Sequence, residues 1–393
     1  MNTVMDTVRF WTAAAAVAVA SVVTAETVDE LEITADTNIV VATGDTLKIE
    51  YLWSATPYVV TKSGGGKLVV ATVGGITNVF FDVQEGTLAS ARPAPIPTAG
   101  DTRPTLRIDC NATNLYTFVT QNGTNFVSKI LDADGGDTYL SSWGGTYDKP
   151  YYTEETLNGL HLLDFGTYQN NNDVVYTNGH GGNLALNKSF TLGEYFYVWK
   201  DRDDAIDMDL HGGSELNGPP VLGNNPSYFS RGLGGGGNGF PYLSTGMGDT
   251  FKMNLKIDGV PTTFSTRIGR GFHLLHNRAK DGSDGVGLSM IGWSIPYGGG
   301  FVLAELVAYS NKLSSAAAAR VSAQLRAKWF GARIDGLTLR EGATLDVSAV
   351  KFDIDTLDVA GGARVVGSTN LAFNVLTKTS TNLVIDAGTF VLD

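Results

Sequence analysis

Residues 298–331 constrain the fold most, because a strand pattern there is followed by the clearest helix pattern in the chain. The apolar run Phe301–Tyr309 predicts a buried strand after a glycine turn. A helix is then predicted with Ser314 or Ser315 as its N-cap and Gly331 just past its end. The helix has an apolar stripe at i, i+4 spacing, formed by Leu313, Ala317, Val321, Leu325 and Trp329. We expect this stripe to pack on a β-sheet, with Arg326 and the other polar residues exposed on the opposite side.

The composition favours an all-β protein with many glycine turns. Only 17% of the 393 residues are charged, and 48 are glycine. The formal net charge of −12 makes nucleic acids and anionic membranes poor partners. A single cysteine, Cys110, excludes an intramolecular disulfide. At this length the chain has room for two or three domains.

Residues 1–25 have the pattern of a secretory signal peptide. Arg9 gives a weakly basic start, residues 10–23 form a short apolar core, and small residues ending at Ala25 offer a cleavage site. The apolar core is shorter than the roughly 20 residues that a membrane-spanning helix needs. A buried N-terminal helix is the alternative. We therefore expect a secreted or cell-surface protein with no transmembrane segment after signal cleavage.

A glycine-led strand pattern recurs on both sides of the central region. A glycine, a small or polar residue and an alternating strand return about every 20 to 26 residues, which is typical of β-solenoid rungs. The pattern starts at Gly44, Gly66, Gly86, Gly342, Gly362 and Gly388. Strands are predicted at residues 38–42, 46–52, 67–72, 78–83 and 87–89. The repeats resemble those of bacterial autotransporter-type passenger proteins, although isolated β-hairpins would give a similar pattern.

Prolines mark a boundary between the first repeats and the central region. Residues 92–104 hold four prolines in thirteen positions, which predicts a stiff extended linker. The predicted organisation is a repeat segment at 26–91, a central domain at 105–331 and a second repeat segment at 332–393. The central domain could be inserted into the flanking solenoid or lie beside it.

The central domain resembles a known family. Its closing segment, AELVAYSNKLSSAAAARVSAQLRAKWFG at residues 304–331, is similar to the last strand and helix of concanavalin A-like (laminin-G-like) lectin and glucanase domains of secreted bacterial proteins. Earlier in the domain, strand patterns at residues 106–113, 194–200 and 251–260 occur in the order that the family shows. Ile130 stands where the family pattern leads us to expect tryptophan. The resemblance implies a jelly-roll β-sandwich with one closing helix, and a role in glycan binding or glycoside hydrolysis.

Aromatic residues in predicted loops are the candidate ligand-binding residues. Flat rings stack on sugar faces, and loop aromatics are exposed more often than strand aromatics, although some of them could instead cover the core. Most of the candidates fall in the Gly/Ser/Asp-rich region 141–152. They are Trp143, Tyr147, Tyr151, Tyr152 and Tyr228.

An acidic run is the candidate metal site. Crowded carboxylates suit Ca²⁺, which takes six to eight oxygen ligands, although a solvated acidic loop would look the same. The run consists of Asp201, Asp203, Asp204, Asp207 and Asp209. A second acidic segment, with Asp132, Asp134 and Asp137, resembles the start of a calcium loop but lacks a glutamate at the twelfth position.

Signals for catalysis are weak. Asp207 and Asp209 are the nearest match to the paired carboxylates of glucanases, but the third carboxylate of that pattern is missing. No Ser-His-Asp arrangement is visible in the sequence. We therefore expect a non-enzymatic binding or adhesion protein that recognises glycan or another cell-surface partner. A self-assembling structural component is the alternative, and a glycoside hydrolase is the third.

Overall fold

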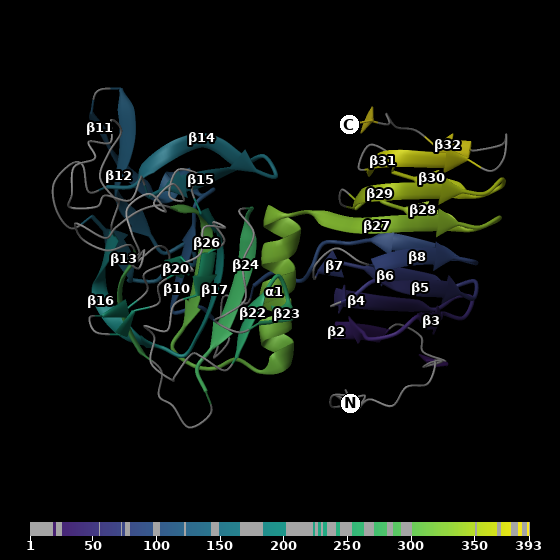
Figure 1. The fold of residues 1–393 in the computed structure, drawn as a ribbon, viewed down its shortest axis with the longest axis horizontal. Helices are drawn as coiled ribbons and strands as arrows, with labels where there is room; N and C mark the ends of the chain where they lie inside the picture. The colour runs from purple at the N-terminus through teal and green to yellow at the C-terminus, as the bar shows by residue number, and fades with distance from the viewer. Residues whose placement is uncertain are drawn as a thin grey trace.

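The computed structural model describes the larger part of the chain. The described residues are 19–20, 26–54, 56–71, 73–74, 79–96, 103–121, 123–142, 149–165, 184–201, 223–224, 227–228, 231–233, 241–243, 254–262, 271–280, 286–291, 301–349, 352–367, 371–378, 384–386 and 391–392. Within them the fold is mostly β, and α1 (Ser315–Trp329) is the one α-helix. Figure 1 shows two bodies of strands with α1 standing between them.

One body is a β-solenoid built from two parallel sheets. The first sheet has the order β1 (Val19–Ala20), β3 (Thr37–Val40), β5 (Tyr58–Ser63), β8 (Val79–Val83), β27 (Ala332–Leu339), β29 (Phe352–Val359), β31 (Leu371–Lys378) and β33 (Val391–Leu392). The second has the order β2 (Glu26–Ile33), β4 (Thr46–Ser54), β6 (Lys67–Val70), β9 (Thr87–Ser90), β28 (Thr344–Asp346), β30 (Arg364–Val366) and β32 (Val384–Asp386), and β7 (Val73–Gly74) pairs with β4.

The predicted solenoid pattern is therefore confirmed, and its glycines have a structural role. Gly44, Gly86, Gly342 and Gly362 all have positive φ angles, from 69° to 91°, at the turns that precede strands of the second sheet. L-residues with a side chain rarely adopt that conformation, so glycine is the natural residue there. The strand predictions missed β2 and β5.

The two repeat segments form one continuous solenoid. β27 pairs in parallel with β8, and β28 pairs in parallel with β9, although about 250 residues separate the strands of each pair in sequence. Leu88 of β9 lies in register with Leu68 on one side and Leu345 on the other, and all three are fully buried. The central region thus lies between β9 and β27, where the chain passes from the second sheet to the first. In a later rung, residues 347–351 make the equivalent connection between β28 and β29. Of the two predicted arrangements, insertion is the one observed.

The inserted region is built on one large sheet. It has the order β23 (Val260–Pro261), β22 (Leu255–Ile257), β24 (His273–Arg278), β17 (Glu194–Asp201), β26 (Phe301–Tyr309), β15 (Leu160–Asp164), β14 (Tyr151–Leu157), β12 (Thr124–Leu131), β13 (Tyr139–Ser141), β16 (Leu184–Leu192) and β25 (Val286–Ile291). β10 (Leu106–Asp109) also pairs with β26, and β11 (Tyr116–Gln121) pairs with β12 after the short 3-10 helix Thr113–Leu115. Two small sheets pair β18 (Gly223–Asn224) with β19 (Ser227–Tyr228), and β20 (Arg231–Leu233) with β21 (Pro241–Leu243).

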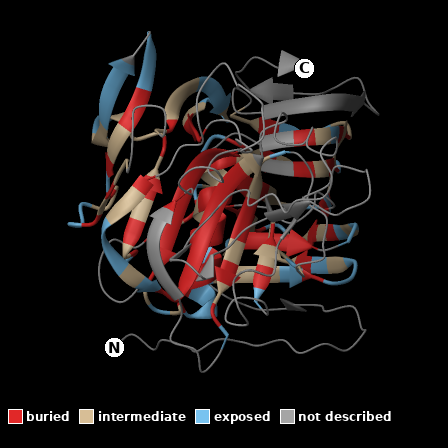
Figure 2. Ribbon diagram, turned by 60° about the vertical axis from the view of Figure 1, so that its left-hand side comes forward, coloured by how far each residue is buried: buried red, intermediate tan, exposed pale blue. Residues whose placement is uncertain are grey.

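β26 is the centre of the insert. All nine of its residues are buried, as the apolar sequence predicted, and Figure 2 shows buried residues concentrated in the middle of the molecule. Along the neighbouring strand β17, alternate residues enter different cores. Tyr197 and Trp199 belong to the core on one face of the sheet, while Phe196 and Val198 pack with Leu325 and Trp329 of α1 on the other.

The helix prediction is confirmed in its bounds and caps. Ser314 Oγ accepts a hydrogen bond from the Ala317 N–H at 3.2 Å, and Gly331 has a φ of 70°. The prediction that Arg326 is exposed is wrong, because this side chain is only 9% exposed. The solenoid covers that side of the helix, where Ala323 packs against Tyr51 and Trp53 of β4. α1 therefore lies between the insert and the solenoid, in contact with both.

The proline-rich segment is not a free linker in its described part. Ile96 is 3% exposed and joins the core beneath α1, and Pro93 and Pro104 are buried. The Ala94 N–H donates to Glu50 Oε2 of the solenoid at 3.1 Å. The stiff proline-rich chain therefore runs along the junction between the two bodies.

Candidate functional site

The structure describes only some of the predicted ligand-binding residues. Trp143 and Tyr147 lie outside the described residues, and for Tyr228 only its backbone position in β19 is described. Tyr151 and Tyr152 were predicted to lie in a loop region, and this is wrong: they begin strand β14, where both are half-buried. The Tyr151 hydroxyl donates to the carboxylate of Asp164 on the paired strand β15, so its polar end is already engaged.

The structure brings Tyr152 together with three other rings. We name Tyr116, Phe118, Tyr152 and His161 the aromatic row. Ring centroids lie 5.0 Å apart between Tyr152 and His161, 6.0 Å between Phe118 and Tyr152, and 5.6 Å between Tyr116 and Phe118. The last two pairs meet edge to face, which is a favourable geometry for aromatic rings. Phe118 is 39% exposed, and its neighbour Val119 is 40% exposed.

Strand geometry creates the aromatic row. Tyr116 and Phe118 are alternate residues of β11, so they project from the same face of that strand. Tyr152 and His161 come from the hairpin of β14 and β15, where Tyr152 pairs with the core residue Leu163. The row therefore continues the buried face of the large sheet outward to its exposed margin.

Polar atoms anchor the row and leave one nitrogen without a protein partner. The Tyr116 hydroxyl donates to the Cys110 carbonyl at 2.9 Å, and burial raises the pKa of Tyr116 well above its usual value. Desolvation also raises the pKa of Tyr152, so both phenols are neutral at physiological pH. His161 Nδ1 is buried and has no hydrogen-bond partner within the described residues. The row thus combines flat apolar rings with one nitrogen that can accept or donate a hydrogen bond.

Sequence reasoning found Tyr152 but missed Phe118 and Tyr116. The signal was present in Tyr116-Thr-Phe118, where two aromatics separated by one residue precede a hydrophilic turn. In a strand, that spacing puts both rings on one face. Loop position was the sequence signal for exposed aromatics, and these two rings lie on a strand.

The candidate calcium ligands are almost all outside the described residues. Asp201 ends β17 and only its backbone is described, while Asp203, Asp204, Asp207 and Asp209 lie outside the described residues. The second acidic segment forms a turn instead of a metal loop. Asp132 accepts hydrogen bonds from the N–H groups of Arg107 and Gly136, both at 2.9 Å. Within the described part of the chain, no group of three or more His, Cys, Asp or Glu residues is arranged to hold a metal ion.

A buried carboxylate on β26 is occupied by structural partners. Glu305 is fully buried, and its two oxygens lie 2.7 Å from Arg107 Nε, 2.6 Å from Lys328 Nζ and 2.7 Å from Trp329 Nε1. These donors hold the closing helix and β10 against the central strand. A carboxylate saturated in this way, without access to solvent, holds the domain together and is not placed to attack a substrate.

Comparison with known proteins gives no family for this chain: no family model, no curated protein and no solved structure matches it. Among the described residues, no helix is long and apolar enough to cross a membrane. The structure itself shows a mostly β chain in which an inserted β-domain interrupts a β-solenoid.

Proposed function

We propose that this protein is a secreted or cell-surface binding protein without catalytic activity, whose inserted domain recognises a glycan. The observation that carries the proposal is the aromatic row. It lies on β11, β14 and β15, and Figure 1 places β11 at the end of the insert farthest from the solenoid. A ligand bound there meets no obstruction from the solenoid, which then acts as a spacer.

The chemistry of the aromatic row suits a pyranose ring. Phe118 and Tyr152 meet edge to face at 6.0 Å, so their surfaces form an angled apolar platform. The C–H faces of a sugar pack on such rings as other apolar ligands pack in aromatic-lined sites, and a few polar atoms then fix the orientation. His161, whose ring centroid lies 5.0 Å from that of Tyr152, is the polar side chain beside the rings.

The resemblance to concanavalin A-like domains supports the same ligand class. An antiparallel sheet with one helix against its central strand is compatible with a lectin-like jelly roll, which we propose as the finer fold of the insert. Trp143, Tyr147 and Tyr228 stay predicted members of the binding surface. Calcium at Asp201–Asp209 stays a prediction as well, and the signal-like residues 1–25 and the net charge of −12 support an extracellular location.

The test is a glycan array with the full chain, followed by titration of the best glycan against two variants. Phe118→Ala removes the exposed ring of the aromatic row and should weaken binding at least about tenfold, the scale of one buried aromatic contact. Phe80→Ala is the matched control, because Phe80 is 40% exposed but lies on β8 of the solenoid. Equal affinity of the two variants, or no glycan bound at all, would reject the proposal.

A second candidate function is self-assembly of a structural surface component. Val59 and Phe80 are 37% and 40% exposed and lie in register on adjacent strands of the first solenoid sheet. Gly336 is the next residue in this register, and a Cβ there would come within 2.7 Å of the Phe80 ring. If this apolar patch mediates assembly, sedimentation velocity should show concentration-dependent oligomers that Phe80→Ala abolishes and Phe118→Ala leaves intact.

A further inference from the structure

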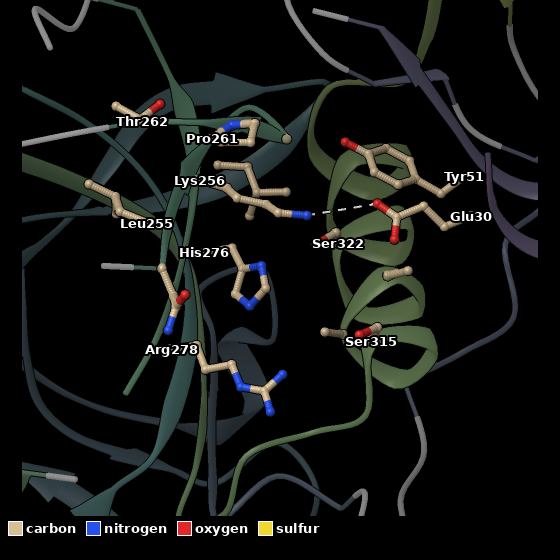
Figure 3. A pocket seen from close by; sticks show the side chains of 15 residues that line it. Glu30, Tyr51, Leu255, Lys256, Pro261, Thr262, His276, Arg278, Ser315 and Ser322 are labelled. Atoms are coloured by element: carbon tan, nitrogen blue, oxygen red, sulfur yellow. Dashed lines mark ion pairs between the residues drawn. The ribbon is translucent and has the colours of Figure 1, made fainter. Parts of the chain in front are cut away.

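A cavity of about 350 Å³ lies where the solenoid, α1 and the outer strands of the insert meet (Figure 3). We name it the junction cavity. Glu30 and Tyr51 line it from the solenoid, Lys256 and Arg278 from β22 and β24, and Ser315 from α1. Its volume is near the lower end of the roughly 300–1,000 Å³ typical of small-molecule sites.

The sequence keeps the cavity open. The side chains of α1 on this side are all short and do not fill the space. They are Ser315, Ala318, Ala319 and Ser322. The opposite wall is polar, because Lys256 pairs in register with His276 and Arg278 follows two residues later on the same face of β24. Polar walls with short opposing residues favour an occupied or hydrated cavity over a collapsed one.

Of the two cationic side chains that line the cavity, one has a close acidic partner and the other has no direct partner among the described residues. Glu30 Oε1 lies 3.9 Å from Lys256 Nζ and accepts from Trp53 Nε1 at 2.9 Å, so the Lys256 and Glu30 charges offset each other. The guanidinium of Arg278 forms no ion pair or side-chain hydrogen bond with the described residues. Figure 3 shows it extending across the cavity toward Ser315. Ser315 is the first residue of α1, where the helix dipole adds partial positive charge.

The remaining titratable side chain of this wall, His276, already has a partner. His276 Nε2 lies 2.7 Å from Glu194 Oε1, and the other Glu194 oxygen accepts from the Leu313 N–H at 2.6 Å. Glu194 is fully buried and lies opposite Arg278 in the pairing of β17 with β24, so its charge is close to the guanidinium. Both of its oxygens are taken by His276 and the Leu313 N–H, so the N–H donors of Arg278 are left for a ligand.

A buried hydroxyl points into the same space. Tyr51 is 2% exposed, its oxygen has no hydrogen-bond partner among the described residues, and Figure 3 shows that oxygen directed toward the cavity. Burial raises the pKa of Tyr51 to about 12, so the group is a neutral donor at physiological pH. A buried hydroxyl without a partner is unfavourable, and an acceptor group of a ligand in the cavity would satisfy it.

We propose that the junction cavity binds an organic anion of about the size of a monosaccharide, with its oxyanion on Arg278 and its hydroxyl groups on Tyr51 and Ser315. A guanidinium with free N–H donors is well suited to a carboxylate, sulfate or phosphate group. A bare inorganic oxyanion would occupy only a small part of the volume, so the remainder favours a larger hydroxylated molecule. The site is separate from the aromatic row and does not depend on the proposed glycan recognition.

Such a ligand would join the two bodies of the protein. It would contact the solenoid through Tyr51, the insert through Arg278 and the helix through Ser315. A molecule that binds the folded protein and not the unfolded chain raises the melting temperature by mass action. Ligand binding should therefore stabilise the docking of the insert on the solenoid.

The experiment is thermal unfolding and calorimetric titration of the full chain with D-glucuronate, using D-glucose as the neutral control at matched ionic strength. Glucuronate should raise the melting temperature, and glucose should not. Sodium sulfate and sodium phosphate form two further arms, because they share the oxyanion without the sugar ring. Responses to sulfate or phosphate equal to the glucuronate response would overturn the assignment to an organic anion.

Two variants locate the site. Arg278→Gln should weaken glucuronate binding at least tenfold, and Tyr51→Phe, which keeps the ring packed, should weaken it severalfold. Arg92→Gln is the control, because Arg92 is exposed and does not line the cavity. Far-ultraviolet circular dichroism first checks that each variant is folded. No response to any anion, or an unchanged response in both Arg278→Gln and Tyr51→Phe, would overturn the proposal.

Discussion

The solenoid and the insert each bury a charged side chain, and they neutralise it in different ways. In the solenoid, Lys62 is fully buried and its ammonium group donates to the backbone carbonyls of Ser63, Gly64 and Glu85. In the insert, Glu305 is fully buried and receives donors from the side chains of Arg107, Lys328 and Trp329. The solenoid uses neutral backbone dipoles, whereas the insert uses full opposite charges.

This difference follows from how each body is assembled. In the solenoid, successive rungs bring the same corner back after about 20 residues, so carbonyls gather there without special side chains: Glu85 is 23 residues from Lys62. In the insert, Arg107 meets Glu305 across a separation of 198 residues. Removing a charge should therefore have different consequences. In the insert it leaves Arg107 and Lys328 with only their outer partners Asp134 and Asp109, and in the solenoid it leaves only carbonyl groups.

The largest effect is expected for Glu305→Ala. The change removes the buried carboxylate that Arg107 and Lys328 share, and breaking a buried pair from one side costs about 3–5 kcal/mol. The free energy of unfolding, from denaturant titration of the full chain, measures it. Glu305→Gln keeps the volume, so a loss of similar size in that variant would assign the cost to charge.

The matched control for Glu305 is Glu154→Ala. Glu154 is an exposed glutamate on β14 of the same domain, and substitutions of this kind usually change stability by less than about 0.5 kcal/mol. If Glu305→Ala were as mild as Glu154→Ala, the ion-pair cluster would not hold the insert together. The solenoid and the insert would then not differ in how much they depend on a buried charge.

The second prediction concerns the two sides of α1. Leu325→Ala should cost about 2–5 kcal/mol, because Leu325 is fully buried against the sheet of the insert. Arg326→Ala should cost about 1–3 kcal/mol, since Arg326 is buried on the other side and its NH1 group lies 3.2 Å from Asp258 Oδ1. Denaturant unfolding of both variants beside the parent gives the two values.

Arg320→Ala is the control for the helix. Arg320 bonds across the junction to Asp29 Oδ1 of the solenoid at 2.9 Å, whereas Arg326 pairs with Asp258 of the insert. The Arg320 side chain is 44% exposed, and exposed pairs contribute about 0–1 kcal/mol. A loss below about 0.5 kcal/mol for Arg326→Ala would mean that the solenoid does not cover this side of α1 in solution. The helix would then belong to the insert alone.

Local patterns predicted much of the fold. The glycine turns at Gly44, Gly86 and Gly342 indicated the rungs, and the run Phe301–Tyr309 with the following helix was predicted within a residue or two of the observed bounds. These features are set by neighbours in sequence. The pairing of β8 with β27 was not predictable, because it depends on two segments that meet only when the insert folds.

The sequence was less informative about the candidate site. Tyr152 was predicted as a ligand-binding residue because it is aromatic. Phe118 lies near it only because β11 pairs with β12 and β12 pairs with β14. Arg326 was misjudged for a similar reason: helix periodicity identifies two faces but cannot show that a second body covers the polar one. The Arg278 and Tyr51 side chains meet in one cavity only because the solenoid and the insert dock.

The smallest expected effect is a pH dependence that arises from Lys62. Burial lowers the pKa of Lys62 from 10.5 to about 8, and this effect outweighs the nearby Glu85 charge, which raises the pKa. Above pH 8 the folded state therefore releases this proton while the unfolded chain still binds it. Stability should rise with pH, by at most about 1.4 kcal/mol per pH unit for one group.

The sign distinguishes Lys62 from the other buried groups that titrate at high pH. Burial raises the pKa of Tyr51 to about 12, so above pH 10 the unfolded chain loses the tyrosine proton first and stability falls. The test window is therefore pH 8 to 9.5, where denaturant unfolding of the parent should show a rise that Lys62→Met lacks. Lys188→Met, at a lysine whose side chain is 53% exposed, should follow the parent. Parallel curves for the parent and Lys62→Met would mean that the carbonyls hold Lys62 charged throughout, and that backbone dipoles neutralise a buried charge as fully as the side-chain cations around Glu305 do.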